Sequence, residues 1–133
     1  MCYEKEKTCR IGEFLYEAIR MGYSYNDSYK LLLTSKQGIG ILSDKYEYVI
    51  HHTGRTSAIK ADCEYGINYN KSNQSKVNGN TCSLIAEFIQ LCHRQYNIPY
   101  DKIFSKISLE DFMKQLGNVL GNYDHKLVRE YIL

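Results

Sequence analysis

Residues 51–55, with the sequence His-His-Thr-Gly-Arg, are the only place in the chain where these residue types gather at the end of an apolar pattern. Histidine titrates near neutral pH, threonine supplies a hydroxyl, and glycine lets a ligand approach the backbone. Arginine binds phosphate or carboxylate through two hydrogen bonds. With an acid and an aromatic downstream, the candidate ligand site for an anionic small molecule or nucleotide comprises His51, His52, Thr53, Arg55, Asp62 and Tyr65.

A structural interpretation of the same residues is favoured over a ligand site. In this interpretation, His52 and Thr53 end a preceding helix by hydrogen-bonding its last carbonyl groups. Gly54 then supplies a left-handed turn, and Arg55 lies in solvent. Because histidine and glycine are common at the carboxyl ends of helices, these residues can be explained without any ligand.

No complete catalytic or metal-binding motif accompanies this segment. Zinc sites usually bring their ligands in closely spaced pairs, and the chain has no CxxC pair. Glu110 and Asp111 fall in a predicted first helical turn, where carboxylates interact favourably with the helix dipole. We therefore predict no catalytic residues, no metal and no cofactor, and a hydrolase or transferase is the least favoured class. The five cysteines are Cys2, Cys9, Cys63, Cys82 and Cys92.

Composition disfavours nucleic acid and membrane partners. The net charge is only +2, and neither half has the basic excess of a protein that binds through phosphates. A helix-turn-helix with its recognition helix at 109–120 would place two acids where phosphates should meet it. No apolar run approaches the roughly 20 residues of a membrane span, and no signal peptide precedes the first predicted helix. We expect a soluble, cytoplasmic protein with reduced thiols.

Helical periodicity predicts the elements of the first half. A helix is expected over 11–21, with Thr8 at its start and Gly22 at its end. Its apolar face comprises Ile11, Phe14, Leu15, Ala18 and Ile19. A shorter helix should begin at Asn26 or Asp27, and Gly38-Ile39-Gly40 should break the pattern.

The following segments are also expected to be helical. A helix over 42–50 with Ser43 or Asp44 at its start is preferred to a strand, although Tyr46, Tyr48 and Ile50 alternate. Residues 57–66 predict another short helix.

The second half carries clearer helical signals. Thr81 or Ser83 is expected to begin a helix over 83–96, and Pro99 suits the first turn of a brief helix through Ile103. Ser108 begins a capping-box-like sequence before a helix that Gly121 should end. Asp124 opens a last helix through Ile132.

These elements predict an all-α fold of about seven short helices in one compact bundle. The 133 residues, 44% of them hydrophobic, suffice for one core. The Asn/Ser/Lys-rich segment 68–80 is expected to be a linker or mobile loop between helical units at 1–67 and 81–133 that share one core. Both units begin with a long amphipathic helix. The alternative interpretation is therefore that the two units are degenerate repeats of each other, whether or not one arose by duplication of the other.

The pattern from Tyr46 to Tyr65 is also found elsewhere. An apolar helix runs into His52-Thr53-Gly54, and a hydrophobic residue, Asp62 and Tyr65 follow. This resembles a family of small uncharacterised all-helical bacterial domains with a His-Thr-x-Gly…Asp…Tyr pattern. The resemblance covers residues 11–67, with a weaker echo at 84–124, and departs where His51 doubles the histidine. Members are often paired with a predicted ADP-ribosyltransferase-like protein, which implies a partner-binding or antitoxin-like role and no catalytic residues.

The predicted function is a non-enzymatic protein-interaction module that binds and inhibits or regulates another protein. Thirteen tyrosines and no tryptophan provide amphipathic side chains for a binding surface, and Tyr23 and Tyr25 are expected to be exposed partner-binding residues. The same helix faces could serve a homodimer. The alternative is capture of an anionic small molecule or nucleotide around His51, His52 and Arg55.

Overall fold

The computed structural model describes residues 3–43, 45, 47–73, 76–116 and 128–133, and every regular element in these ranges is helical. The predicted all-α class is confirmed. The α-helices are α1 (Tyr3–Arg20), α2 (Tyr25–Thr34), α3 (Lys36–Leu42), α4 (Gly54–Tyr65), α5 (Gly79–Gln95) and α6 (Leu109–Leu116). The shorter turns are the π-helical η1 (Glu47–His51) and η4 (Val128–Ile132) and the 3-10 turns η2 (Gly66–Asn68) and η3 (Tyr100–Lys102).

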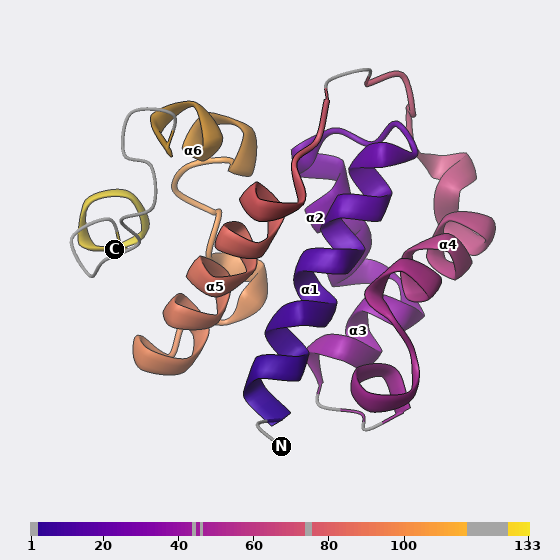
Figure 1. The fold of residues 1–133 in the computed structure, drawn as a ribbon. Helices are drawn as coiled ribbons and strands as arrows, with labels where there is room; N and C mark the ends of the chain where they lie inside the picture. The colour runs from indigo at the N-terminus through magenta and orange to yellow at the C-terminus, as the bar shows by residue number, and fades with distance from the viewer. Residues whose placement is uncertain (1–2, 44, 46, 74–75, 117–127) are drawn as a thin grey trace.

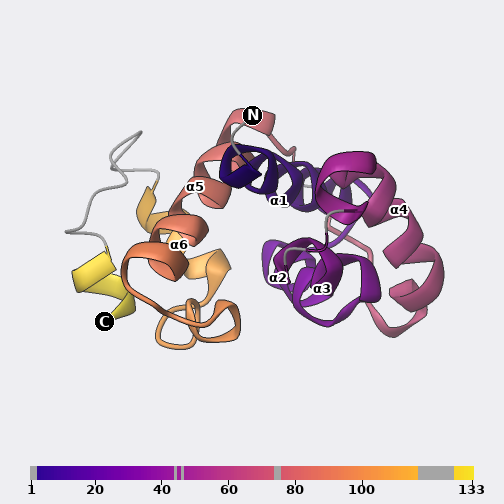
Figure 2. The ribbon, with the colours of Figure 1, turned by 90° about the horizontal axis from the view of Figure 1, so that it is seen from below.

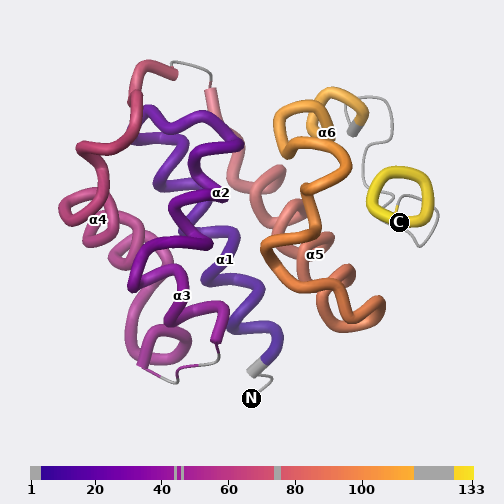
Figure 3. The backbone as a smooth tube through the Cα atoms, turned by 180° about the vertical axis from the view of Figure 1, so that it is seen from behind, coloured from indigo at the N-terminus to yellow at the C-terminus, as the bar shows by residue number. Residues whose placement is uncertain are grey.

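Helix α1 is the central element. In Figures 1 and 2, α4 lies on one side of α1 and α5 on the other, while α2 and α3 cover a third side. The view from behind in Figure 3 shows α6 and the C-terminal turn beyond α5, away from α3 and α4. Within the described residues, no helix is long and apolar enough to cross a membrane.

The core face of α1 follows the predicted periodicity. Ile11, Phe14 and Leu15 are fully buried, and Ala18 and Ile19 complete the stripe. The helix begins at Tyr3, earlier than predicted, so Thr8 is not a cap and its hydroxyl donates to the Glu4 carbonyl (2.9 Å). Gly22 follows the helix with φ of 109°, which confirms it as the left-handed residue after α1.

The Gly38-Ile39-Gly40 segment corrects a prediction. It does not break the helical pattern but lies within α3, where Ser35 accepts a hydrogen bond from the Gly38 N–H (2.9 Å). A Cβ at Gly38 would lie within 2.7 Å of Leu32 Cα. The glycine therefore permits α2 and α3 to approach closely, although glycine lowers helix propensity.

The helix predicted over 42–50 was wrong in extent. α3 ends at Leu42, and Ser43 is its C-terminal cap rather than the start of another helix. A single π-helical turn, η1, follows, and it buries Val49. Among the described residues of this segment no strand forms, while Asp44 and Tyr46 lie outside them.

The 68–80 segment contacts the first half of the chain. Asn73 donates from its backbone N–H to the Gly22 carbonyl and from its side-chain amide to the Tyr23 carbonyl, both at 3.0 Å. Helix α5 then begins at Gly79 with Asn78 as its cap, ahead of the predicted Thr81 or Ser83. One buried cluster contains side chains from both α1 and α5.

The brief helix predicted from Pro99 is shorter than expected. Pro99 precedes only the 3-10 turn η3. Ser108 does cap α6, because its hydroxyl accepts from the Asp111 N–H (3.2 Å). The predicted stop at Gly121 and start at Asp124 lie outside the described residues.

Phe88 is the aromatic centre of the second half, and its removal should destabilise the fold. It is fully buried and stacks on Phe112 with ring centroids 4.5 Å apart. We expect Phe88→Ala to lower the free energy of unfolding by about 3–5 kcal/mol in urea denaturation, because a cavity remains. The control Ile67→Ala, at a side chain that is 94% exposed, should change it by less than about 0.5 kcal/mol. Equal effects of the two substitutions would contradict this core.

Candidate functional site

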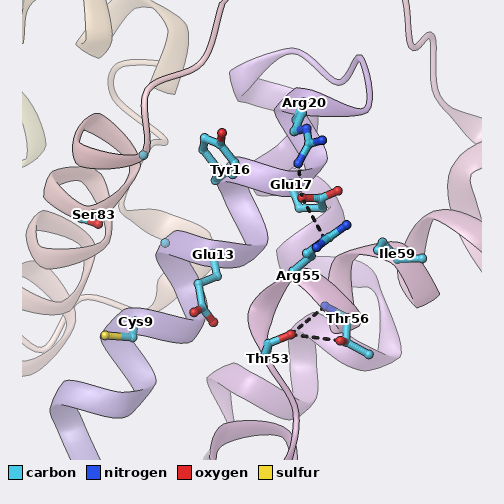
Figure 4. A pocket seen from close by; sticks show the side chains of 12 residues that line it. Cys9, Glu13, Tyr16, Glu17, Arg20, Thr53, Arg55, Thr56, Ile59 and Ser83 are labelled. Carbon is cyan, nitrogen blue, oxygen red and sulfur yellow. Dashed lines mark hydrogen bonds and ion pairs between the residues drawn. The ribbon is translucent and has the colours of Figure 1, made fainter.

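A groove of about 790 Å³ runs between α1, the first half of α4 and the start of α5. Figure 4 shows its side chains pointing into the space between these helices. The lining residues are Cys9, Gly12, Glu13, Tyr16, Glu17 and Arg20 from α1, Thr53, Arg55, Thr56 and Ile59 from the start of α4, and Gly79 and Ser83 from α5.

The wall formed by α4 depends on a close contact with α1. Gly54 is buried, and a Cβ there would lie 2.7 Å from the Phe14 backbone nitrogen and closer still to the Arg10 carbonyl oxygen. The Gly54 N–H donates to Glu13 Oε1 (2.8 Å), and the Arg10 guanidinium donates to the same oxygen (2.8 Å). Only a residue without a side chain allows the first turn of α4 to reach α1 in this way.

The helix-end interpretation of residues 52–54 was therefore wrong. Thr53 begins a helix: its hydroxyl accepts from the Thr56 N–H (3.1 Å), as an N-cap does. Gly54 is the first residue of α4, and Gly22 is the only glycine with positive φ among the described residues. The exposed position predicted for Arg55 is confirmed.

Glu13 occupies the place where an anionic ligand would bind. The amino end of a helix favours negative charge and offers free N–H groups. At the amino end of α4 this charge is the chain's own Glu13 carboxylate, which Arg10 also contacts. A small anion at the predicted pocket would have to displace this carboxylate.

Glu17 lies one turn further along α1 and faces two arginines. Its Oε2 is 3.7 Å from Arg20 Nη1 and 3.7 Å from Arg55 Nε, as the dashed lines of Figure 4 mark. The Glu17 side chain is 9% exposed, whereas those of Arg20 and Arg55 are 57% and 65% exposed. Both guanidinium groups therefore remain accessible from the groove.

The two histidines do not line this groove. His51 is exposed on η1, and His52 lies 3.6 Å from the Glu47 carboxylate with its ring centroid 5.8 Å from that of Tyr48. Of the six predicted ligand residues, the groove thus brings together only Thr53 and Arg55.

Asp62 forms a link between α4 and the turn after α1. It accepts from the Tyr23 hydroxyl (2.7 Å) and from Lys71 Nζ (2.9 Å). Burial by itself would raise the pKa of Asp62, but the hydrogen bonds from Lys71 and Tyr23 outweigh it and lower that pKa below its ordinary value. The half-buried Tyr65 packs against the core, and neither residue lines the groove.

The expected exposure of Tyr23 was wrong. Tyr23 is fully buried: its hydroxyl donates to Asp62, and its ring lies beside Tyr69 with centroids 5.2 Å apart. Burial, followed by the hydrogen bond to Asp62, raises the pKa of Tyr23. Tyr25 is half-buried, and its backbone N–H donates to Glu110 of α6 (2.7 Å).

The α1 side of the groove was missed by the sequence analysis. Glu13, Tyr16, Glu17 and Arg20 fall at i, i+3, i+4 and i+7 and form a second stripe beside the core face. That spacing was a usable signal. Across the described part of the chain, no three His, Cys, Asp or Glu side chains gather to hold a metal ion.

No protein-family model, no curated protein and no solved structure matches this chain. The family resemblance drawn from the His-Thr-Gly pattern therefore stays a prediction.

Two glycines at the first positions of helices test the contact between α1 and α4. A Cβ at Gly54 would meet the backbone of α1, whereas the nearest atoms to a Cβ at Gly79 are 3.9 Å away, in the Tyr16 ring. We expect Gly54→Ala to lower the free energy of unfolding by about 1–3 kcal/mol through overpacking. Gly79→Ala should leave it unchanged or raise it by up to about 1 kcal/mol. Thermal unfolding measures both, and a harmless Gly54→Ala would refute the close approach.

The Asp62 contact should make stability depend on pH in the acid range. Because the pKa of Asp62 is lowered in the folded protein, its carboxylate stabilises the fold above the unfolded pKa of about 3.9. This contribution is lost as the pH falls through the folded pKa. Urea unfolding between about pH 5 and pH 3 should therefore show a smaller decrease in the free energy of unfolding for Asp62→Asn than for the wild type. For the exposed control Asp101→Asn, the free energy of unfolding should fall with pH as steeply as it does for the wild type. The same pH dependence in all three proteins would argue against the contact of Asp62 with Tyr23 and Lys71.

Proposed function

We propose that this protein is a non-enzymatic interaction module that binds a segment of a partner protein in the groove between α1, α4 and α5. Binding would regulate the partner by covering that segment. The proposal rests on the length of the groove, on its mixture of apolar and charged side chains, and on the internal occupation of the predicted anion site.

The length of the groove is the observation that carries the proposal. It follows α1 from Cys9 to Arg20, and eleven residues of helix span about 16 Å. An extended segment of about five residues, at roughly 3.3 Å each, covers the same distance. Such a site suits a piece of polypeptide better than a compact metabolite.

The lining also resembles the surface of a protein interface. The half-buried ring of Tyr16 and the 38% exposed side chain of Ile59 provide apolar area. Arg20 and Arg55 lie beside them. Tyrosine and arginine are enriched where proteins bind one another, and apolar area with a polar rim is the usual arrangement.

The anionic small-molecule alternative has weaker support. Its pocket required the two histidines, Thr53 and Arg55 to act together, but only the last two line the groove. Glu13 also fills the anion position at the start of α4. A second copy of this chain could occupy the groove instead and form a homodimer. Native mass spectrometry distinguishes a homodimer from a complex with a different protein.

Two exposed isoleucines allow a matched test of the groove. Ile59 lines it and is 38% exposed, whereas Ile67 lies outside it and is 94% exposed. We expect Ile59→Asp to abolish capture of a stoichiometric partner from native lysate, and Ile67→Asp to retain it, because only the first places a charge in the groove. Native mass spectrometry identifies the partner or a homodimer, and thermal unfolding confirms that both variants fold. A partner retained by Ile59→Asp and lost with Ile67→Asp would refute the proposal.

A further inference from the structure

We infer that the segment bound in this groove carries an acidic side chain, held between Arg20 and Arg55, next to an apolar side chain that packs on Tyr16, while Ile59 lies on the other side of the two arginines. This inference rests on the proposed function and specifies its ligand. The occupant is a partner protein with a carboxylate beside an apolar residue.

The positions of these four residues form two matched pairs on facing helices. Tyr16 and Arg20 are four residues apart on α1, and Arg55 and Ile59 are four residues apart on α4. Side chains at this spacing share one face of a helix. Each helix therefore contributes one guanidinium group and one apolar group to the lining. In Figure 4, Glu17, Arg20 and Arg55 form a row with Tyr16 on its α5 side and Ile59 on the opposite side.

The charges at this end of the groove do not balance. Glu17 is the single carboxylate that contacts both arginines, and at 3.7 Å neither contact has hydrogen-bond length. The other acidic side chain of the lining, Glu13, is engaged by Arg10 and by the Gly54 N–H. Around Glu17, two guanidinium groups thus share one carboxylate and keep unused N–H donors, while nearer the amino end of α1 Arg10 is shared by the carboxylates of Glu6 and Glu13.

Glu17 makes this arrangement possible by holding two cations together. Its side chain, 9% exposed, lies between Arg20 and Arg55, whose mutual repulsion its charge reduces. A second carboxylate, supplied by the partner, can accept from one or both guanidinium groups in the geometry that arginine favours. That carboxylate completes a set of two positive and two negative charges.

Space beside Tyr16 accommodates the neighbouring apolar side chain. On the α5 side, Gly79 lies close to the Tyr16 ring, because a Cβ there would be 3.9 Å from the ring, an ordinary van der Waals contact. The half-buried ring is therefore accessible only over the part of it that lines the groove. An aliphatic or aromatic side chain there would bury apolar area at about 25 cal/mol per Å².

A random peptide library displayed on phage tests the inference with a defined probe. Selection on the immobilised wild type should enrich peptides in which Asp or Glu neighbours an apolar residue. Their synthetic versions should bind Arg55→Glu and Arg20→Glu about tenfold to hundredfold more weakly, as expected for loss of a charge-assisted hydrogen bond. Selection on Arg55→Glu should instead favour Lys or Arg. The control Lys60→Glu changes the same charge on α4 outside the groove and should bind like the wild type.

The outcomes separate the inference from the function on which it rests. Enriched peptides that lack acids but lose binding with Ile59→Asp would overturn the inference and leave the groove as a peptide site. Peptides insensitive to Ile59→Asp, or no enrichment at all, would overturn both. Stabilisation of the wild type but not of Arg55→Glu by succinate, without peptide enrichment, would assign the arginines to a free carboxylate. Melting curves and Arg55→Gln, which removes the charge without reversing it, exclude misfolding as the cause.

Discussion

The rest of the structure depends on the close approach between the middle of α1 and the first turn of α4. Gly54 allows the two backbones to meet, and Glu13 accepts the Gly54 N–H while Arg10 contacts both Glu13 and the Val49 carbonyl (2.9 Å). One turn of α1 thereby holds the middle of η1 and the start of α4. The N–H group of Gly54 at the start of α4 is hydrogen-bonded by Glu13, which is distant in sequence, so the α4 wall of the groove has a defined position.

This constraint lets α1 serve two purposes at once. One stripe of its side chains, including Phe14 and Leu15, is buried in the core. The adjacent stripe, including Tyr16, Glu17 and Arg20, lines the groove. Residues of the two stripes alternate along the same helix, so the backbone of this wall of the groove is held in place by the core beneath it. A surface preorganised in this way loses little conformational entropy on binding a partner segment.

The core was predictable from sequence, whereas most of the groove was not. Apolar spacing located the buried faces of α1 and α5, because helical periodicity is a local signal. The same local analysis assigned Thr53 and Gly54 to the end of one helix and not to the start of the next. Local sequence does not decide between the two, because threonine can begin a helix and glycine can end one. The decision depends on Glu13, which lies 41 residues away from Gly54 and cannot be identified as its partner from sequence alone. Tyr23 was misplaced for the same reason: its partner Asp62 comes from another helix.

Site-specific cross-linking tests the central claim, that the groove binds a partner segment, most directly. Cys9 lines the groove and Cys63 is exposed outside it, while burial raises the pKa of Cys82 and of Cys92 to about 12 and suppresses their reactivity. Two variants, both with Cys2→Ser, would be compared in native lysate. One carries a photoreactive label on Cys9, and the other carries it on Cys63. The account predicts that one defined partner peptide is cross-linked from Cys9 and not from Cys63. A partner cross-linked from Cys63 alone would contradict it.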